Sequence, residues 1–201
     1  MNRLATLLLG LLCCLCAGLA QAAPREYRFD PVHSRLLFLV DHLGFSRSIG
    51  SFRAWQGSFA FDPEDWSSAS VDVRIDIRSL DMGDAAWNRT LLGPRWFDAE
   101  QYPEARFVAR GLHALGADRG ELRGELSLRG QTRPLVLTVK VNRIGLHRYT
   151  LKATAGFSAR AALRRSEYGM DALLDQVGDE VELLIEVEGQ WDKPKDRPGK
   201  R

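Results

Sequence analysis

Histidine offers this chain its widest choice of chemistry, because the imidazole binds metal ions and transfers protons near neutral pH. The sequence has four histidines, His33, His42, His113 and His147. His33 and His42 lie nine residues apart, but no cysteine or further ligand accompanies them at the spacing of a zinc site. We therefore expect no metal. A hydrogen bond that holds the first strand, or that meets the polar head of a ligand, is the favoured role.

Nucleophilic catalysis needs a nucleophile beside a base, and the sequence does not present one. Ser34 follows His33 directly, and neighbours in a strand point to opposite faces of a sheet. No Gly-x-Ser-x-Gly turn and no phosphate-binding glycine loop occurs. Arg164 and Arg165 are able to meet a phosphate group, although a solvated pair is the commoner role for adjacent arginines. The pattern predicts a protein without a catalytic centre or a cofactor.

The elements that would position these residues are strands, and the segment 71–78 shows this best. It alternates apolar and charged side chains for eight residues. Period-two alternation puts the apolar residues on one face of a sheet and the charged residues on the other, which must face water. The inward residues are Val71, Val73, Ile75 and Ile77, and the outward residues are Asp72, Arg74, Asp76 and Arg78.

The rest of the chain repeats this strand pattern from Tyr27 onward. Phe52 differs in parity from Trp55, so a bulge or bend is expected near Arg53 or Gly57. Between residues 81 and 101 the pattern changes to about two turns of helix that end at Gly93-Pro94. The predicted strands cover 36–40, 49–61, 71–78, 105–112, 121–129, 135–141, 149–160 and 181–187.

About eight strands with one apolar face bury that face either as two stacked sheets or as one barrel. The alternation alone leaves this choice open. A barrel of the outer membrane would need an apolar outer face, whereas one face of each clear strand here is rich in Asp, Glu and Arg. The pattern therefore argues against stable insertion in a membrane.

The N-terminus is typical of an exported protein. Arg3 precedes an apolar run, and Ala20-Gln21-Ala22 has the small residues that signal peptidase reads. We expect cleavage after Ala22, a periplasmic location and loss of all three cysteines, which lie in this run. A lipoprotein anchor is the alternative. The predicted domains are a signal peptide over 1–22, one globular domain over 23–189 and a disordered basic tail over 190–201.

The overall charge excludes one class of partner. The 28 basic and 26 acidic residues nearly balance, and only the short C-terminal tail is basic. A nucleic-acid-binding domain normally carries a basic face. We therefore expect no nucleic acid as partner.

Several short motifs, in order and at matching spacing over roughly Tyr27 to Gly189, resemble the YceI-like family of polyisoprenoid-binding proteins. The N-terminal ones are Asp30-Pro31-Val32-His33-Ser34, His42-Leu43-Gly44 and Gly50-Ser51-Phe52. The later ones are Ser79-Leu80-Asp81, Trp96-Phe97-Asp98, Tyr102-Pro103, Gly124-Glu125-Leu126-Ser127-Leu128-Arg129-Gly130, Tyr168-Gly169 and Val177-Gly178-Asp179. One departure from the family is that Arg89 is followed by Thr90-Leu91, where members often carry Asp and His.

The resemblance implies an all-β fold: an eight-stranded antiparallel, lipocalin-like barrel with a short helical segment between strands. It implies an exported carrier or scavenger of a long-chain lipid, such as a polyprenyl chain, an isoprenoid quinone or a fatty-acid derivative. An enzyme or isomerase-like helper that acts on such a lipid is the alternative, and a homodimer stays open. The expected ligand-binding residues are Phe38, His42, Phe52, Trp55, Phe59, Arg89, Leu91, Phe97, Phe107, Gly124, Leu126, Phe157 and Arg165.

Overall fold

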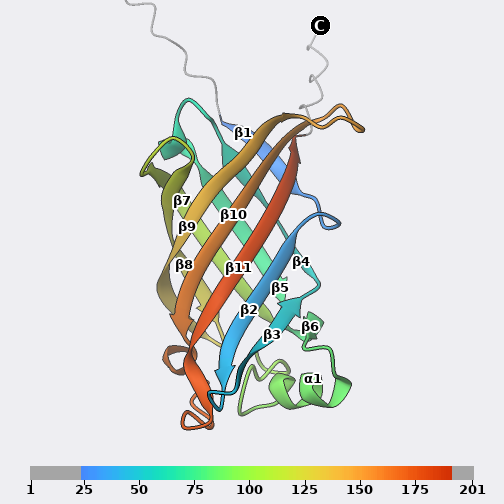
Figure 1. Ribbon diagram of the computed structural model, residues 1–201, viewed down its shortest axis with the longest axis vertical. Coiled ribbons are helices and arrows are strands. Elements are labelled where there is room, and N and C mark those ends of the chain that lie inside the picture. The colour runs from blue at the N-terminus through green and yellow to red at the C-terminus, as the bar shows by residue number, and fades with distance from the viewer. Residues whose placement is uncertain (1–23, 192–201) are drawn as a thin grey trace, which may run out of the picture.

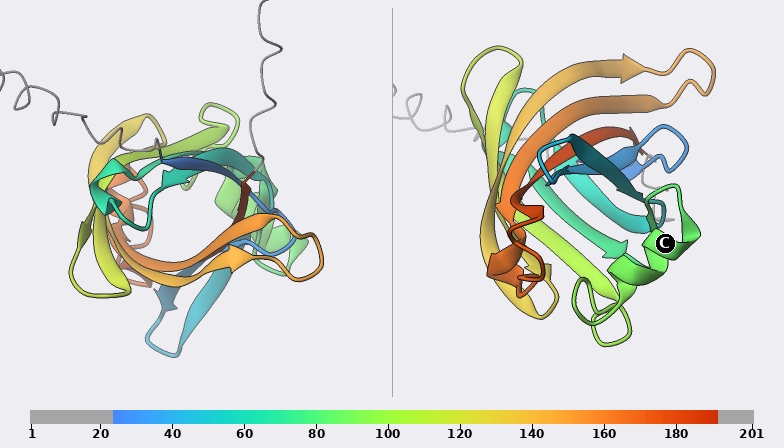
Figure 2. Two further views of the ribbon diagram at one scale, coloured as in Figure 1. Left: turned by 90° about the horizontal axis from the view of Figure 1, so that it is seen from above. Right: turned by 60° about the horizontal axis from the view of Figure 1, so that its bottom comes forward.

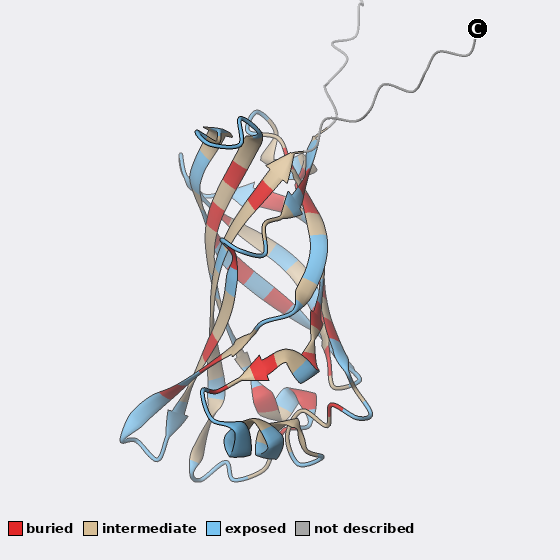
Figure 3. Ribbon diagram, turned by 90° about the vertical axis from the view of Figure 1, so that its right-hand side faces the viewer, coloured by how far each residue is buried: buried red, intermediate tan, exposed pale blue. Residues whose placement is uncertain are grey.

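The computed structural model describes residues 24–191, and these form one elongated barrel of antiparallel strands with a single α-helix at its lower end (Figure 1). The strands alternate buried and exposed residues along their length (Figure 3). Their bounds are β1 Arg25–Phe29, β2 Arg35–His42, β3 Ser46–Phe52, β4 Trp55–Phe61, β5 Ser70–Asp76, β6 Leu80–Asp81, β7 Glu104–Ala114, β8 Arg119–Leu128, β9 Gln131–Leu146, β10 Ala153–Arg164 and β11 Val177–Trp191.

Eight of these strands close a ring in the order β1-β4-β5-β7-β8-β9-β10-β11, with β11 pairing back to β1. The closing ladder is antiparallel and joins Tyr27 to Trp191 and Phe29 to Gly189. Figure 2 looks down the ring. The predicted antiparallel eight-stranded barrel is thereby confirmed, and the stacked-sheet alternative is wrong for this chain.

The lower part of the barrel is built by a second arm of strands. β11 pairs with β2 through its N-terminal half, from Val177 to Glu186, and with β1 through its last residues. β2 then pairs with β3, and β3 with the short β6. No pairing joins β6 to β7 among the described residues. The lower wall therefore lacks one ladder, on the side where the helix lies (Figure 1).

β5 follows the predicted alternation, but it ends earlier than the sequence suggests. The strand stops at Asp76, and Ile77–Ser79 forms a 3-10 turn, η2. The Asp76 carboxylate accepts a hydrogen bond from the Arg78 amide at 3.0 Å and so caps this turn. Ile77 is nevertheless only 1% exposed. The predicted inward face is correct, and the predicted strand is wrong for its last two residues because a local cap competes with the ladder.

The predicted long strand 49–61 is two strands, β3 and β4, separated at Arg53 and Ala54. The predicted bend near Arg53 is therefore present. Gly57 has a φ of 149°, and a Cβ there would lie 2.1 Å from the Asp72 carbonyl oxygen, so only glycine fits this close approach. At the C-terminal end, β11 continues to Trp191, past the Gly189 at which the apolar pattern stops.

The predicted helix is present as α1, Ala85–Leu92. The Asp84 carboxylate caps it by accepting a hydrogen bond from the Trp87 amide at 2.8 Å. Gly93 follows its last turn, as predicted. No helix in residues 24–191 is long and apolar enough to span a bilayer. The predicted signal peptide and all of the basic tail after Trp191 lie outside the described residues.

The turn between β1 and β2 gives His33 and Ser34 separate roles. His33 is exposed and shares a 3.1 Å hydrogen bond with the Asp30 carboxylate. Ser34 is buried, and its hydroxyl accepts a hydrogen bond from the Glu188 amide at 3.0 Å. The predicted structural role for His33 fits this geometry. The two side chains face away from one another and cannot act as a nucleophile and base.

The Asp30 hydrogen bond, followed by the charge of the same carboxylate, raises the pKa of His33 above its ordinary value. Because the folded pKa is raised, this pair stabilises the fold below the unfolded pKa of about 6.5, and that contribution is lost as pH rises through the folded pKa. An NMR titration of the His33 ring should show the raised pKa. In Asp30→Asn it should return towards the ordinary value, and an unchanged pKa would contradict the assignment.

Candidate functional site

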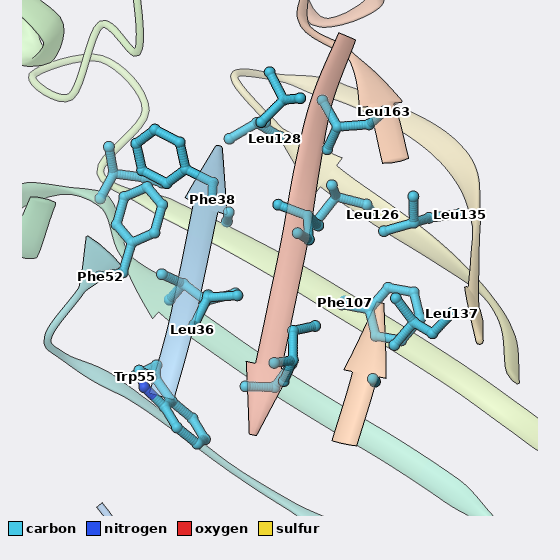
Figure 4. Close-up of a pocket in the computed structure, with 18 of the residues that line it drawn as sticks. Leu36, Phe38, Phe52, Trp55, Phe107, Leu126, Leu128, Leu135, Leu137 and Leu163 are labelled. Carbon is cyan, nitrogen blue, oxygen red and sulfur yellow. The ribbon is translucent and has the colours of Figure 1, made fainter. Parts of the chain in front are cut away.

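The interior of the barrel contains a cavity of about 430 Å³, which is within the range of pockets that hold small-molecule ligands. Strands from all sides contribute apolar side chains that converge on it (Figure 4). Leu126, Leu128, Leu135 and Leu137 line it from β8 and β9, and Phe107 lines it from β7. These are the inward positions of alternating strands, so the parity of the sequence creates the lining.

Aromatic rings close the upper end of the cavity. Tyr27 stacks on Phe59 with a 5.0 Å centroid distance and an 11° interplanar angle. Phe157 meets Phe59 and Phe61 edge to face, at 5.4 and 5.2 Å. Tyr27, Phe59, Phe61 and Phe157 are all buried. Such edge-to-face and offset pairs add stability beyond their burial. We refer to this packed, closed upper end of the cavity as the aromatic floor.

The lower end of the cavity opens beside α1. His42, Trp87, Thr90 and Leu173 all line the cavity there, and all are exposed to solvent. The His42 and Trp87 rings lie 6.4 Å apart, so β2 and α1 meet at this point. The cavity is therefore an apolar tunnel that reaches solvent at a mouth beside α1 and ends at the aromatic floor of buried rings.

A second aromatic group lies between the mouth and the deeper tunnel. Phe97 contacts Phe52 at 5.6 Å and Phe38 at 6.4 Å, and Phe38 contacts Phe52 at 5.7 Å. Phe97 belongs to the irregular segment after α1, which fills the side of the barrel where β6 and β7 do not pair. These three rings narrow the route from the mouth to the floor.

The polar side chains that line the tunnel are few. Apart from Arg165, whose guanidinium is bound to backbone carbonyl groups, they are His42, Ser48 and Thr90 near the mouth and Ser70 near the floor. No hydrogen bond joins His42 to Ser48 or Thr90 within residues 24–191. The lining can therefore surround an apolar chain along its length and offer polar groups to its end. It does not pair a nucleophile with a base.

Of the thirteen residues predicted to contact a ligand, eleven line this cavity. They come from β2, β3, β4, β7, β8, β10, α1, the 3-10 turn η3 (Arg165–Tyr168) and the segment after α1. They are Phe38, His42, Phe52, Trp55, Phe59, Leu91, Phe97, Phe107, Leu126, Phe157 and Arg165. The structure brings these residues together, whereas Arg89 and Gly124 lie elsewhere.

Arg89 is exposed on α1 and does not line the cavity. Gly124 has the predicted inward orientation, but the ring of Phe107 covers it. A Cβ at Gly124 would lie 2.6 Å from the Phe107 ring and 2.5 Å from the Val108 carbonyl oxygen. A larger residue at Gly124 would therefore disturb the β7–β8 ladder and not simply narrow the tunnel.

Arg165 touches the cavity, but its guanidinium is committed to backbone carbonyl groups. It is 3% exposed. Its Nε donates to the Gly178 carbonyl at 2.8 Å, Nη1 donates to Met170 and Ala172 at 2.6 and 2.9 Å, and Nη2 donates to Val177 at 2.6 Å. Burial lowers the pKa of Arg165 from its ordinary value. A solvated arginine pair is therefore the wrong description of Arg165, although Arg164 beside it is exposed.

The sequence missed several lining residues at both ends. Phe29 ends the short β1, Trp87 lies in α1, Trp96 follows the helix, and Leu173 lies in a loop. None of them belongs to a long alternating run, so no periodicity marks them as inward. The sequence also missed that Glu188 lies beside Asp30 and His33, with one ligand atom of each within 4.8 Å of the others. These three residues are already engaged in the β1–β2 turn and its contact with β11.

Residues 27–189 match the family model described as the YceI-like domain. The chain belongs to the YceI-like family. A UPF0312 protein of Photorhabdus laumondii is 31% identical to it over 88% of this chain and 91% of that protein. Protein YceI of Salmonella arizonae is 31% identical over 86% of this chain and 90% of that protein.

Solved YceI-like barrels have the same fold. The crystal structure of BcnA from Burkholderia cenocepacia superposes with a TM-score of 0.73 at 24% identity, covering 80% of this chain and 98% of BcnA. A polyisoprenoid binding domain from Saccharophagus degradans, implicated in plant cell wall breakdown, superposes with a TM-score of 0.64 at 16% identity, covering 83% and 98%. At these identities the likeness is one of fold. It does not extend to the residues that line the tunnel of this YceI-like chain.

Proposed function

We propose that this YceI-like protein is an exported carrier that holds the tail of a long-chain isoprenoid or a similar amphiphilic lipid in its barrel. The apolar tunnel of about 430 Å³ supports this most directly. Removing apolar surface from water is favourable by about 25 cal/mol per Å². Burial of an apolar tail therefore favours binding along the whole tunnel. The polar lining residues near the mouth suit a head group that stays close to water.

The dimensions of the barrel fit a tail that runs its depth. β8 contains 10 residues, which at about 3.3 Å per residue and a tilt of about 40° correspond to a height of roughly 25 Å. A chain of several prenyl units is longer than this. Its distal part is therefore expected to fold back or to protrude from the mouth.

Export and periplasmic location remain part of the proposal. The apolar run before Ala20-Gln21-Ala22 supports them, and the N-terminal sequence of the exported protein should then begin near Ala23. A chain that keeps Met1 in the exported fraction, or that carries a lipid on Cys13 or Cys16, would contradict this processing.

Organic extraction of the purified protein, followed by mass spectrometry, tests the carrier function. A carrier should release about one lipid per chain, chemically unchanged between binding and release. Steady conversion of an added lipid would instead support an enzyme acting in the same tunnel. The absence of any lipid, under conditions in which a known carrier retains one, would contradict both.

Ala159→Leu should select against long tails. Ala159 lies on β10 between Val139 and Ile185 and lines the tunnel. The added methyl groups should displace part of a long tail, and each buried methylene lost costs about 0.8 kcal/mol. The ratio of long to short lipids retained should fall about threefold or more. Ala162→Leu is the matched control, because Ala162 is on the same strand but exposed. An unchanged chain-length profile in folded Ala159→Leu would place the tail elsewhere.

A further inference from the structure

Large apolar side chains are exposed on the protein surface immediately outside the tunnel mouth. They are Leu43 and Phe45 in the β2–β3 turn and Leu174 in the loop before β11. Phe45 is 89% exposed. None of the three lines the cavity. We refer to Leu43, Phe45 and Leu174 as the rim.

Contacts between the surrounding segments join the rim to the tunnel. The Leu43 amide donates to the Gln176 carbonyl at 2.8 Å, which holds the β2–β3 turn against the loop that carries Leu174. Trp87 and Leu173 are exposed beside these segments and also line the tunnel. Apolar side chains are therefore exposed on the same segments that carry the lining residues of the mouth.

Two leucines at this end occupy backbone positions that normally disfavour them. Leu43 has a φ of 56° and Leu173 a φ of 53°, and Leu151 in the β9–β10 hairpin shares this conformation with a φ of 56°. A β-carbon in the left-handed region costs about 1 kcal/mol, which glycine would avoid and asparagine would reduce. The turns therefore present leucine to solvent at a cost in stability, where a polar or small residue would fold more easily.

The charges around the rim do not form a basic surface. Asp41, Asp84, Asp171 and Asp175 are exposed in the segments that surround it, and they outnumber the exposed arginines of the helical segment, Arg89 and Arg95. Arg47, the nearest arginine in the chain to Phe45, donates to the Glu182 carboxylate at 2.7 Å. Proteins that bind anionic membranes do so through clusters of lysine and arginine. The rim lacks such a cluster among the described residues, and its chemistry favours a neutral apolar partner.

We propose that the rim inserts into the surface of a lipid bilayer rich in zwitterionic lipid, so that the tunnel mouth opens directly into the lipid phase. The inference rests on the proposed carrier function, because a long apolar tail is dissolved in a bilayer and not in water. Docking by the mouth lets the tail pass between bilayer and tunnel without exposure to water. The driving force is burial of the rim, so docking persists at high salt and weakens as anionic lipid is added.

Flotation with phosphatidylcholine vesicles tests the docking without any cargo. The exported form should float with the vesicles at both low and high salt, and less well when phosphatidylglycerol is included. The variant Leu43→Asn, Phe45→Ser, Leu174→Ser should lose about tenfold or more of its vesicle partitioning, because three exposed apolar side chains are removed. Asparagine is tolerated in the left-handed region, so the Leu43 change is compatible with the turn. Circular dichroism checks that the variant is folded.

The opposite end of the barrel provides the matched control. The β9–β10 hairpin extends from the upper end (Figure 1) and exposes Leu146, Tyr149 and Leu151, with Tyr149 92% exposed. Leu146→Ser, Tyr149→Ser, Leu151→Asn removes as many exposed apolar side chains. It should keep its vesicle partitioning within about twofold if the mouth faces the bilayer. All forms share one N-terminus, so a difference between them reports the substituted surface.

Each contrary result overturns the inference and leaves the carrier function separately testable. Equal flotation of wild type and rim variant, or loss only in the hairpin variant, would show that the rim does not dock. A wild-type protein that does not float, but whose sedimentation shows a dimer that the rim variant lacks, would make the rim a surface for self-association. In each case lipid extraction from the same preparations still reports whether the tunnel carries cargo.

Discussion

Replacing Arg165 with methionine is expected to destabilise the protein by about 3 kcal/mol or more. The guanidinium donates to four carbonyl oxygens, those of Met170, Ala172, Val177 and Gly178. Methionine fills much of the volume but leaves these acceptors without a donor, and each unsatisfied buried group costs about 1–3 kcal/mol before relaxation. Urea unfolding measures the effect. Because these carbonyls hold the segment between β10 and β11, the mouth should loosen with it.

Two further variants, one at this position and one beside it, separate geometry from charge. Arg165→Lys keeps the charge but has three donors on one nitrogen and no planar fork, so it should recover only part of the lost stability. Arg164→Gln removes the neighbouring exposed charge and should change stability by no more than about 0.5 kcal/mol. The Arg165 guanidinium also lies 5.1 Å from the centre of the Trp96 ring, and Arg165→Met would lose this cation–π contact as well. If Arg165→Met were as stable as wild type, the carbonyl network would not hold this segment.

Ile75→Asp is expected to cost a similar amount, about 3 kcal/mol or more. Ile75 is 7% exposed and lines the tunnel beside Ala105 and Trp55, its partners on β7 and β4. A carboxylate there loses its hydration and gains no cationic partner in the apolar lining. The thermal unfolding midpoint should fall sharply, or the variant should fail to accumulate.

Asp76→Asn is the control, because it is the adjacent residue on the opposite face. Asp76 is partly exposed, and its hydrogen bonds from Arg78 lower the pKa of its carboxyl group. Asparagine can keep the cap of the following turn, and an exposed ion pair contributes little. The free energy of unfolding should change by about 0.5 kcal/mol or less. An equal loss of stability in the two variants would contradict the assignment of Ile75 to the inner face of β5 and Asp76 to its outer face.

The sequence alone determined which side of each long strand faces inward. Val71, Val73 and Ile75 all line the tunnel, as their alternation with charged residues predicts. The place of the helix was likewise readable from Gly93 and the apolar spacing before it. These features depend on residues close together in the chain, where the period of the backbone directly sets the direction of each side chain. The motifs that resemble the YceI-like family then selected the barrel over stacked sheets.

Only the tertiary structure decided where the tunnel is closed and where it opens. The ring closes between Tyr27 and Trp191, far apart in the sequence, and the floor depends on rings from β1, β4 and β10 meeting there. Arg165 and Gly124 show the same limit at single residues. The sequence assigned both to the ligand site, but Arg165 is bonded to backbone carbonyls and the Phe107 ring covers Gly124. A strand's period fixes the face on which a side chain lies, whereas its neighbours on that face come from other strands and are set only when the barrel closes.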